Sequence, residues 1–234
     1  MIDVRHKGGR NRTHQVMHEL GQSIAVGDYG PCNPFPIEAE LCRRLSVSRS
    51  VLREAVKMLT AKGMLGSRPR QGTYVEPERV WNLLDPDVLS WLLERKFSRE
   101  LLLQFMEVRL AIEPTAARLA ARAGDTEERG AIALALARMQ AAETGGDDPL
   151  ESDIAFHVAI LQASGNPFYA RLRDLIAAAL KTSIRLTNKA KGVRLASIAE
   201  HASVYDAIKS GDEDAAGNAM LSLITEAMAL AKTL

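Results

Sequence analysis

An apolar pattern with the period of an α-helix runs from about residue 83 almost to the end of the chain. Side chains three and four residues apart share one face of a helix, so this pattern predicts helices that bury one side against each other. Short polar or glycine-containing stretches interrupt it, and it shows no strand-like alternation. The body is therefore predicted to be an antiparallel bundle of roughly seven helices, over 83–93, 101–121, 125–143, 148–163, 167–187, 194–209 and 213–232.

The first 75 residues carry a different pattern. Apolar stripes predict a first helix that includes Met17 to Val26, a short second one from Ile37 to Leu45, and a third that Ser48 caps and Gly63 ends. A tight turn joins the second helix to the third. Residues 64–75 then read as two short strands around a Pro/Gly turn. This order predicts a winged helix-turn-helix.

The start of the third helix has the chemistry of a DNA reader. Its positive N-terminus and the hydroxyls of Ser48 and Ser50 suit phosphate, and an arginine fork, from Arg49 or Arg53, matches a guanine edge. The alternative is an ordinary solvated face of an amphipathic helix. A basic hairpin directly after this helix favours DNA binding, and its contact candidates are Arg68, Arg70, Gly72 and Thr73.

Charge and composition agree with that interpretation. Residues 1–75 hold twelve Lys and Arg against six Asp and Glu, whereas the rest of the chain holds eighteen against twenty-three. The sequence has no long apolar run and no secretory leader, which predicts a cytoplasmic protein that makes no membrane contact. Cys32 and Cys42 fit no zinc pattern and are interpreted as packing residues.

Several ionisable residues fall on apolar faces of the body helices. Asp153 and His157 are four residues apart, as are Arg109 and Glu113, and His201 lies in a later apolar helix. Nitrogen and carboxylate groups that converge from facing helices are one way to build a metal or anion site. The alternative is an Asp–His pair within one helix and a core histidine that is satisfied by its neighbours.

The head resembles the winged helix of the GntR family. The matching stretches keep the family's spacing over about 60 residues; they are Phe35–Leu41, Val47–Ala55, Gly63–Leu65 and Arg68–Val75. In that family the position of Ala39 often holds an arginine that touches DNA, so one expected contact is missing here. Arg49, Arg53 and the two serine hydroxyls do match.

The body resembles the helical effector domain, of the FCD type, found in the FadR-like branch of that family. The matching stretches are Glu107–Pro114, Asp153–His157, Ser164–Pro167, Glu200–His201 and Tyr205–Ile208. The resemblance implies a divalent metal such as zinc held by Asp153, His157 and His201. The family's fourth ligand, a histidine, falls at Leu223. The same three residues could instead bind the effector directly.

Within this branch the sequence is most similar to regulators of sugar-acid catabolism. That similarity implies a hydroxylated carboxylate effector, with Arg109 on its carboxylate and Asp153, Glu113 and the Thr187-Asn188 region near its hydroxyls. His157 and His201 complete the expected effector site.

Together these features predict a tail (1–12), a DNA-binding domain (13–75), a linker (76–82) and an effector and dimerisation domain (83–234). The expected function is a homodimeric repressor that binds pseudo-palindromic double-stranded DNA and is released by a small carboxylate. The alternatives are a metal-dependent enzyme in the helical domain and a constitutive DNA-binding dimer without an effector.

Overall fold

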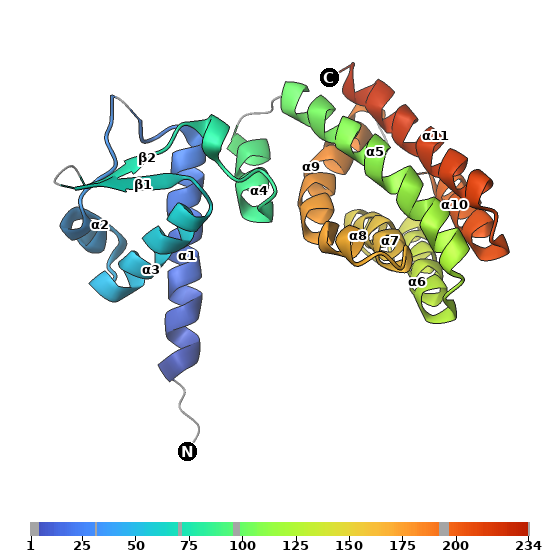
Figure 1. Cartoon of the computed structure of the whole chain (residues 1–234), viewed down its shortest axis with the longest axis horizontal. Coiled ribbons are helices and arrows are strands. Elements are labelled where there is room, and N and C mark those ends of the chain that lie inside the picture. The colour runs from blue at the N-terminus through green and yellow to red at the C-terminus, as the bar shows by residue number, and fades with distance from the viewer. Residues whose placement is uncertain (1–4, 31, 70–71, 96–98, 192–196, 234) are drawn as a thin grey trace. The chain divides into compact units, whose positions relative to one another are not determined.

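In a computed structural model the chain folds into two compact units, Met1–Lys96 and Phe97–Leu234 (Figure 1). The structure describes residues 5–30, 32–69, 72–95, 99–191 and 197–233. These residues form helices and one two-stranded antiparallel sheet, which confirms the mainly helical fold class.

The N-terminal unit is a winged helix-turn-helix followed by one further helix. Its elements are α1 (Arg5–Val26), α2 (Glu38–Leu45), α3 (Arg49–Ala61), β1 (Leu65–Arg68), β2 (Gly72–Val75), a 3-10 turn (Glu78–Val80) and α4 (Pro86–Arg95). The turn between α2 and α3 depends on Ser46, which adopts a left-handed conformation with φ of 52°. The two strands pair in register from Leu65 with Val75 to Arg68 with Gly72. The predicted wing is therefore present.

Apolar side chains from α1, α2 and α3 form the core of this unit, and the most buried include Leu20, Leu41, Leu52 and Leu59. Two members of the predicted stripes are exposed instead, Val26 at 53% and Ile37 at 70%. Val26 is the last residue of α1, and Ile37 precedes α2 in an extended conformation. Neither side chain lies on the buried face of a helix. Spacing alone therefore predicts an apolar stripe that is too long at the helix ends.

Helix α4 packs against α1 in the N-terminal unit, whereas the apolar pattern of the sequence predicts it as part of the effector and dimerisation domain. Trp91 is 1% exposed, and its indole Nε1 donates a hydrogen bond to Nδ1 of His18 at 2.9 Å. Leu83 and Leu84, expected inside this helix, lie exposed before it. The helix starts later because Asp85 accepts hydrogen bonds from the amides of residues 87 and 88 and so caps it.

The described residues of the C-terminal unit form a bundle of seven helices. They are α5 (Arg99–Ala123), α6 (Thr126–Glu143), α7 (Pro149–Ala163), α8 (Pro167–Arg171), α9 (Arg173–Lys191), α10 (Ile198–Ser210) and α11 (Glu213–Ala231). Asp125, Asp148 and Asp212 cap three of them through side-chain oxygens, as the sequence predicts for Asp125. The single helix predicted over 167–187 is divided at Leu172 into α8 and α9.

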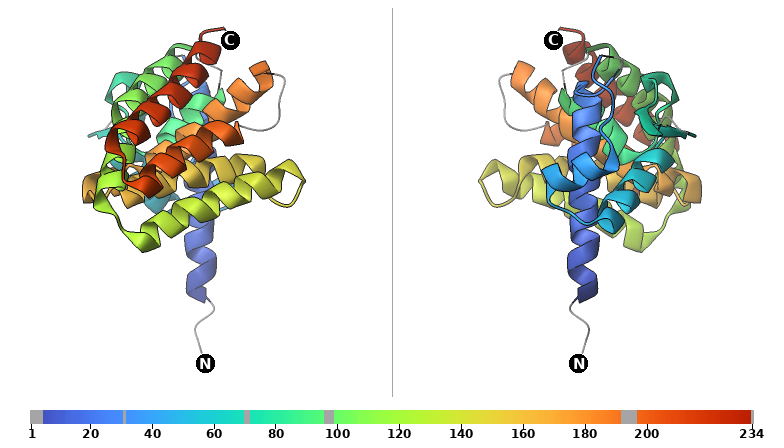
Figure 2. Two further views of the ribbon diagram at one scale, coloured as in Figure 1. Left: turned by 90° about the vertical axis from the view of Figure 1, so that its right-hand side faces the viewer. Right: turned by 90° about the vertical axis from the view of Figure 1, so that its left-hand side faces the viewer.

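Helix α11 lies beside α5 along much of its length (Figures 1 and 2). Helix α7 packs against α5, α6 and α9, and most of its residues are buried. Its central place explains why polar side chains on α7 lie deep in the bundle. Across the described residues, no helix has both the length and the apolar character that crossing a membrane requires.

Two glycine substitutions test the packing of α4 on α1. A Cβ added at Gly21 would overlap the six-membered ring of Trp91, whereas one added at Gly130, in α6, meets no atom within 4 Å. Both sites are inside helices, where alanine is favoured over glycine by about 1 kcal/mol. We expect Gly21→Ala to destabilise the N-terminal unit by about 1–3 kcal/mol through overpacking, and Gly130→Ala to stabilise the helical unit slightly.

Urea unfolding separates the two effects. Both tryptophans, Trp81 and Trp91, lie in the N-terminal unit, so their fluorescence reports that unit, while far-ultraviolet circular dichroism is dominated by the helical one. An unchanged fluorescence transition in Gly21→Ala would contradict the α1–α4 contact.

Candidate functional sites

The start of α3 presents polar side chains on the surface of the N-terminal unit. Ser48 is the N-cap, with its Oγ accepting a hydrogen bond from the amide of Val51 at 3.4 Å and lying 2.9 Å from Oγ of Ser50. The side chains of Arg49 and Arg53 are 73% and 64% exposed. The residues predicted to contact DNA in this helix are therefore grouped at one exposed helix N-terminus.

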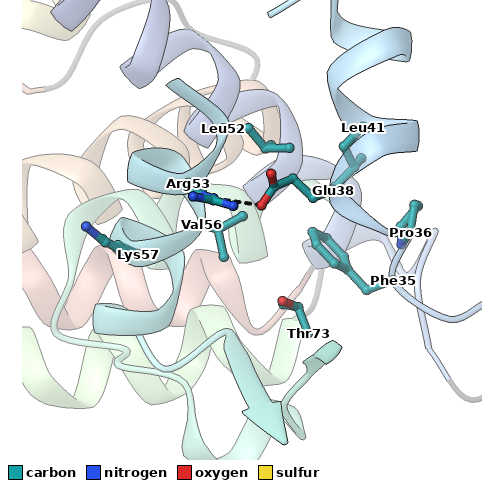
Figure 3. A pocket seen from close by; sticks show the side chains of 9 residues that line it. All are labelled: Phe35, Pro36, Glu38, Leu41, Leu52, Arg53, Val56, Lys57 and Thr73. Atoms are coloured by element: carbon teal, nitrogen blue, oxygen red, sulfur yellow. Dashed lines mark hydrogen bonds and ion pairs between the residues drawn. The ribbon is translucent and has the colours of Figure 1, made fainter. Parts of the chain in front are cut away.

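Glu38 connects both arginines and was not predicted as a functional residue. Arg53 Nε donates to Glu38 Oε2 at 2.8 Å (Figure 3). Arg49 Nε lies 3.7 Å from Glu38 Oε1. The hydrogen bond from Arg53 lowers the pKa of Glu38 below its ordinary value, and the same bond raises the pKa of Arg53. An acidic residue in the first turn of a helix is usually explained by its favourable interaction with the helix dipole. The sequence therefore gives no signal that Glu38 also contacts the arginines of α3.

The wing lies next to α3. Thr73 lines a pocket together with Phe35, Glu38, Arg53 and Lys57 (Figure 3). Gly72 has φ of +84°, a left-handed conformation that favours glycine. The guanidinium of Arg68 stacks over the Tyr74 ring at 4.6 Å from its centre. The structure thus brings Thr73 close to α3, whereas predicted Arg70 is outside the described residues.

Five predicted ligand residues converge in the core of the helical unit. They come from α5, α7 and α10, and each is at most 3% exposed: Arg109, Glu113, Asp153, His157 and His201. Buried charged groups are costly unless they are paired, so a polar cluster of this density is a candidate functional site. We call these five residues the buried cluster.

Glu113 is the centre of one half of the buried cluster. Arg109 Nε donates to its Oε1 at 2.6 Å, and His157 Nδ1 lies 2.5 Å from its Oε2. Burial alone would raise the pKa of Glu113, but the charges of Arg109 and His157 outweigh that effect and lower the pKa to about 2. Burial alone would lower the pKa of His157, and Glu113 and Asp153 outweigh it and raise this pKa.

Asp153 is the centre of the other half. Its Oδ1 lies 3.4 Å from Nε2 of His157 and 3.3 Å from Nε2 of His201. Each of the three residues offers one potential metal-ligand atom, and these three atoms lie within 4.8 Å of one another. Burial would raise the pKa of Asp153, but the two adjacent histidines outweigh it and hold the pKa well below its usual range.

The orientation of His201 leaves two buried atoms unsatisfied. Its Nδ1 lies 2.7 Å from the carbonyl oxygen of Ser197, which can only accept, so Nδ1 carries the proton. In neutral His201, Nε2 then directs a lone pair at Asp153 Oδ1, and neither atom has a hydrogen-bond partner. A cation between these two atoms would satisfy both. The donor set therefore fits a divalent metal.

The remaining predicted positions of the effector site are Leu223, where the family has its fourth ligand, and Thr187 and Asn188. Leu223 is buried on α11, and among the described residues the group of potential metal ligands contains the three predicted members alone. Thr187 and Asn188 belong to α9, which continues to Lys191, but their side chains are outside what the structure describes.

In comparisons with known proteins, each of the two units matches a protein-family model. Residues 12–75 match the model described as bacterial regulatory proteins, gntR family, and residues 104–226 match the FCD domain. The galactonate operon transcriptional repressor of Escherichia coli is 34% identical over 92% of this chain and 94% of its own. The chain belongs to the GntR family.

This GntR-family protein has further relatives of similar length. The transcriptional regulator LutR of Bacillus subtilis is 28% identical over 86% of this chain and 93% of its own. The solved structure of Lar, described as controlling the expression of the agr system of Listeria monocytogenes, has a TM-score of 0.65 and 20% identity. The match covers 95% of this chain and 97% of that one. That likeness concerns the fold alone.

Family membership settles the broad class. A GntR-family winged helix joined to an FCD domain is a DNA-binding transcriptional regulator, and the relatives are regulators as well. The alternative of a metal-dependent enzyme is therefore not supported.

Proposed function

We propose that this GntR-family protein represses a sugar-acid catabolic operon and that a small hydroxycarboxylate releases it from DNA. The observation that supports this proposal is the buried cluster, because it combines a cationic fork with an unsatisfied metal-type donor set inside a helical domain. The name of the galactonate operon repressor, which is 34% identical to this chain over 215 residues, supports the ligand class.

The charge of the buried cluster favours an anionic ligand. Histidines that bind a metal are neutral, and in that state one arginine and two carboxylates give the buried cluster a net charge of −1 before the metal is counted. One divalent cation changes this to +1, and a monocarboxylate would then restore neutrality. Because uncompensated charge in a protein interior is costly, the loaded cluster is expected to prefer an anion over a neutral sugar.

Asp153, His157 and His201 would hold the metal, which when bound would supply a Lewis-acid contact for the effector carboxylate. Glu113 on Nδ1 of His157 and the Ser197 carbonyl on Nδ1 of His201 fix the orientation of both rings, as outer contacts do in established metal sites. Arg109 offers the bidentate partner for a carboxylate, and Thr187 and Asn188 are proposed to meet the hydroxyls.

On the DNA side we propose a homodimer that places two recognition helices in successive major grooves of a pseudo-palindrome. Arg49 and Arg53 would read bases, while Ser48, Ser50, Arg68, Arg70, Gly72 and Thr73 would contact phosphates or the minor groove. Effector binding would favour a dimer geometry that no longer fits both half-sites.

The test is a selection from a random duplex library followed by binding to the selected DNA. We expect Arg49→Ala to lose about 1–3 kcal/mol of discrimination between selected and scrambled duplex. A panel of sugar acids, with zinc, is expected to release the wild-type protein. Selection of no sequence would contradict the repressor, and equal loss of affinity by Arg49→Ala on both duplexes would contradict its base contact. Failure of every acid to release the DNA would favour a constitutive regulator.

A further inference from the structure

We propose that Glu38 is a positioning residue for DNA recognition: it holds the guanidinium of Arg53, and secondarily that of Arg49, in the orientation that selects a base. This inference rests on the proposed function. It follows from a contact between the first turn of α2 and the exposed face of α3, where Arg53 Nε donates to Glu38 Oε2 at 2.8 Å (Figure 3).

The contact with Glu38 leaves the base-binding end of the Arg53 guanidinium available. Glu38 engages Nε, so the two terminal nitrogens of the guanidinium remain as a pair of donors. A fork of two N–H groups is what the O6 and N7 acceptors of guanine require in the major groove. The second carboxylate oxygen lies 3.7 Å from Nε of Arg49. One carboxylate therefore restrains two neighbouring arginines that are each more than 60% exposed.

Restraint matters because an exposed arginine samples many rotamers. An unrestrained side chain loses that freedom when it binds a base, whereas one already held loses less. A held fork also has one preferred direction, so a base pair that does not present two acceptors there is penalised. Glu38 carries a negative charge towards DNA, which weakens binding to every sequence through repulsion of phosphates. Its expected effect is better discrimination at lower overall affinity.

A matched control is available on the same helix. Glu38 and Glu40 are both acidic residues in the first turn of α2, so each interacts with the helix dipole and each contributes one negative charge. Glu40 is exposed. A general loss of α2 stability or of negative charge would therefore appear equally in Glu38→Ala and Glu40→Ala, whereas loss of positioning would appear in Glu38→Ala alone.

The experiment selects DNA from a random duplex library with the full-length wild type and with Glu38→Ala, Glu38→Gln, Glu40→Ala and Arg53→Ala. Sequencing gives the base preference at each position, and fluorescence anisotropy gives affinity for random duplex. We expect both alanine variants of α2 to bind random duplex at least as tightly as the wild type. Glu38→Ala is expected to lose about fivefold or more in preference at the position that Arg53→Ala also affects.

Further arms keep the inference falsifiable. Glu38→Gln, which keeps an acceptor oxygen, should retain part of the preference. At the position that Arg53→Ala affects, the double variant Glu38→Ala with Arg53→Ala should lose no more preference than Arg53→Ala alone. Tryptophan fluorescence checks that each variant is folded. The inference is overturned if Glu38→Ala selects the wild-type sequence undiminished or if Glu40→Ala loses the same preference. A wild type without any preference would instead remove the proposed function itself.

Discussion

Glu113→Ala is expected to lower the free energy of unfolding of the helical unit by about 3–5 kcal/mol, the cost typical of breaking a buried ion pair from one side. The substitution leaves Arg109 at 3% exposure without the carboxylate that its Nε contacts at 2.6 Å. His157 loses its Nδ1 partner at the same time. Urea unfolding followed by far-ultraviolet circular dichroism measures the change.

A double substitution separates this pair from a simple loss of packing. Arg109→Met with Glu113→Leu removes both charges, and we expect it to recover most of the lost stability, because apolar replacements of buried ion pairs are often neutral or better. Arg122→Ala is the control, since it breaks an Arg–Glu pair whose arginine is 65% exposed in the same unit. Its expected effect is much smaller. Strictly additive losses in the double variant would contradict the coupling.

Asp153→Asn is expected to weaken zinc binding by at least about 100-fold, because even residues that only orient metal ligands cost 10–100-fold when they are replaced. Asp153 is the central acceptor between the two Nε2 atoms, and the substitution removes the charge while it keeps the volume. Calorimetric titration of the metal-free full-length protein with zinc measures affinity directly, without DNA or effector.

The matched control for this substitution is Asp206→Asn on α10, an exposed position in the same unit, which should leave zinc affinity unchanged. Thermal unfolding gives an independent readout, because a ligand that binds the folded state raises its melting temperature. Equal affinity in Asp153→Asn and the wild type would contradict the proposed ligand. A wild type that binds a sugar acid but no zinc would assign the buried cluster to direct effector contacts.

Local sequence signals predicted much of this molecule. Apolar periodicity located most helices of the bundle, and capping chemistry at Asp125 and Ser48 fixed two starts, because both depend on residues within one or two turns. The resemblance to the GntR family was needed to relate His201 on α10 to Asp153 on α7, since spacing joins residues only within one helix.

The remaining features depend on contacts between distant segments. The apolar residues of α4 could be buried in either unit. The contacts of Trp91 with Gly21 and His18 of α1 decide that the N-terminal unit buries them. The role of Glu38 requires the crossing of α2 and α3, which places it 2.8 Å from Arg53.

The sequence by itself thus determined the helices, the wing and the identity of the charged residues, because these follow from local periodicity and residue chemistry. Only the tertiary structure decided which charges meet across helices: Glu113 of α5 with His157 of α7, and Asp153 of α7 with His201 of α10. The physical reason is that electrostatic pairing in a core depends on distances of a few ångströms, and helix packing alone sets those distances.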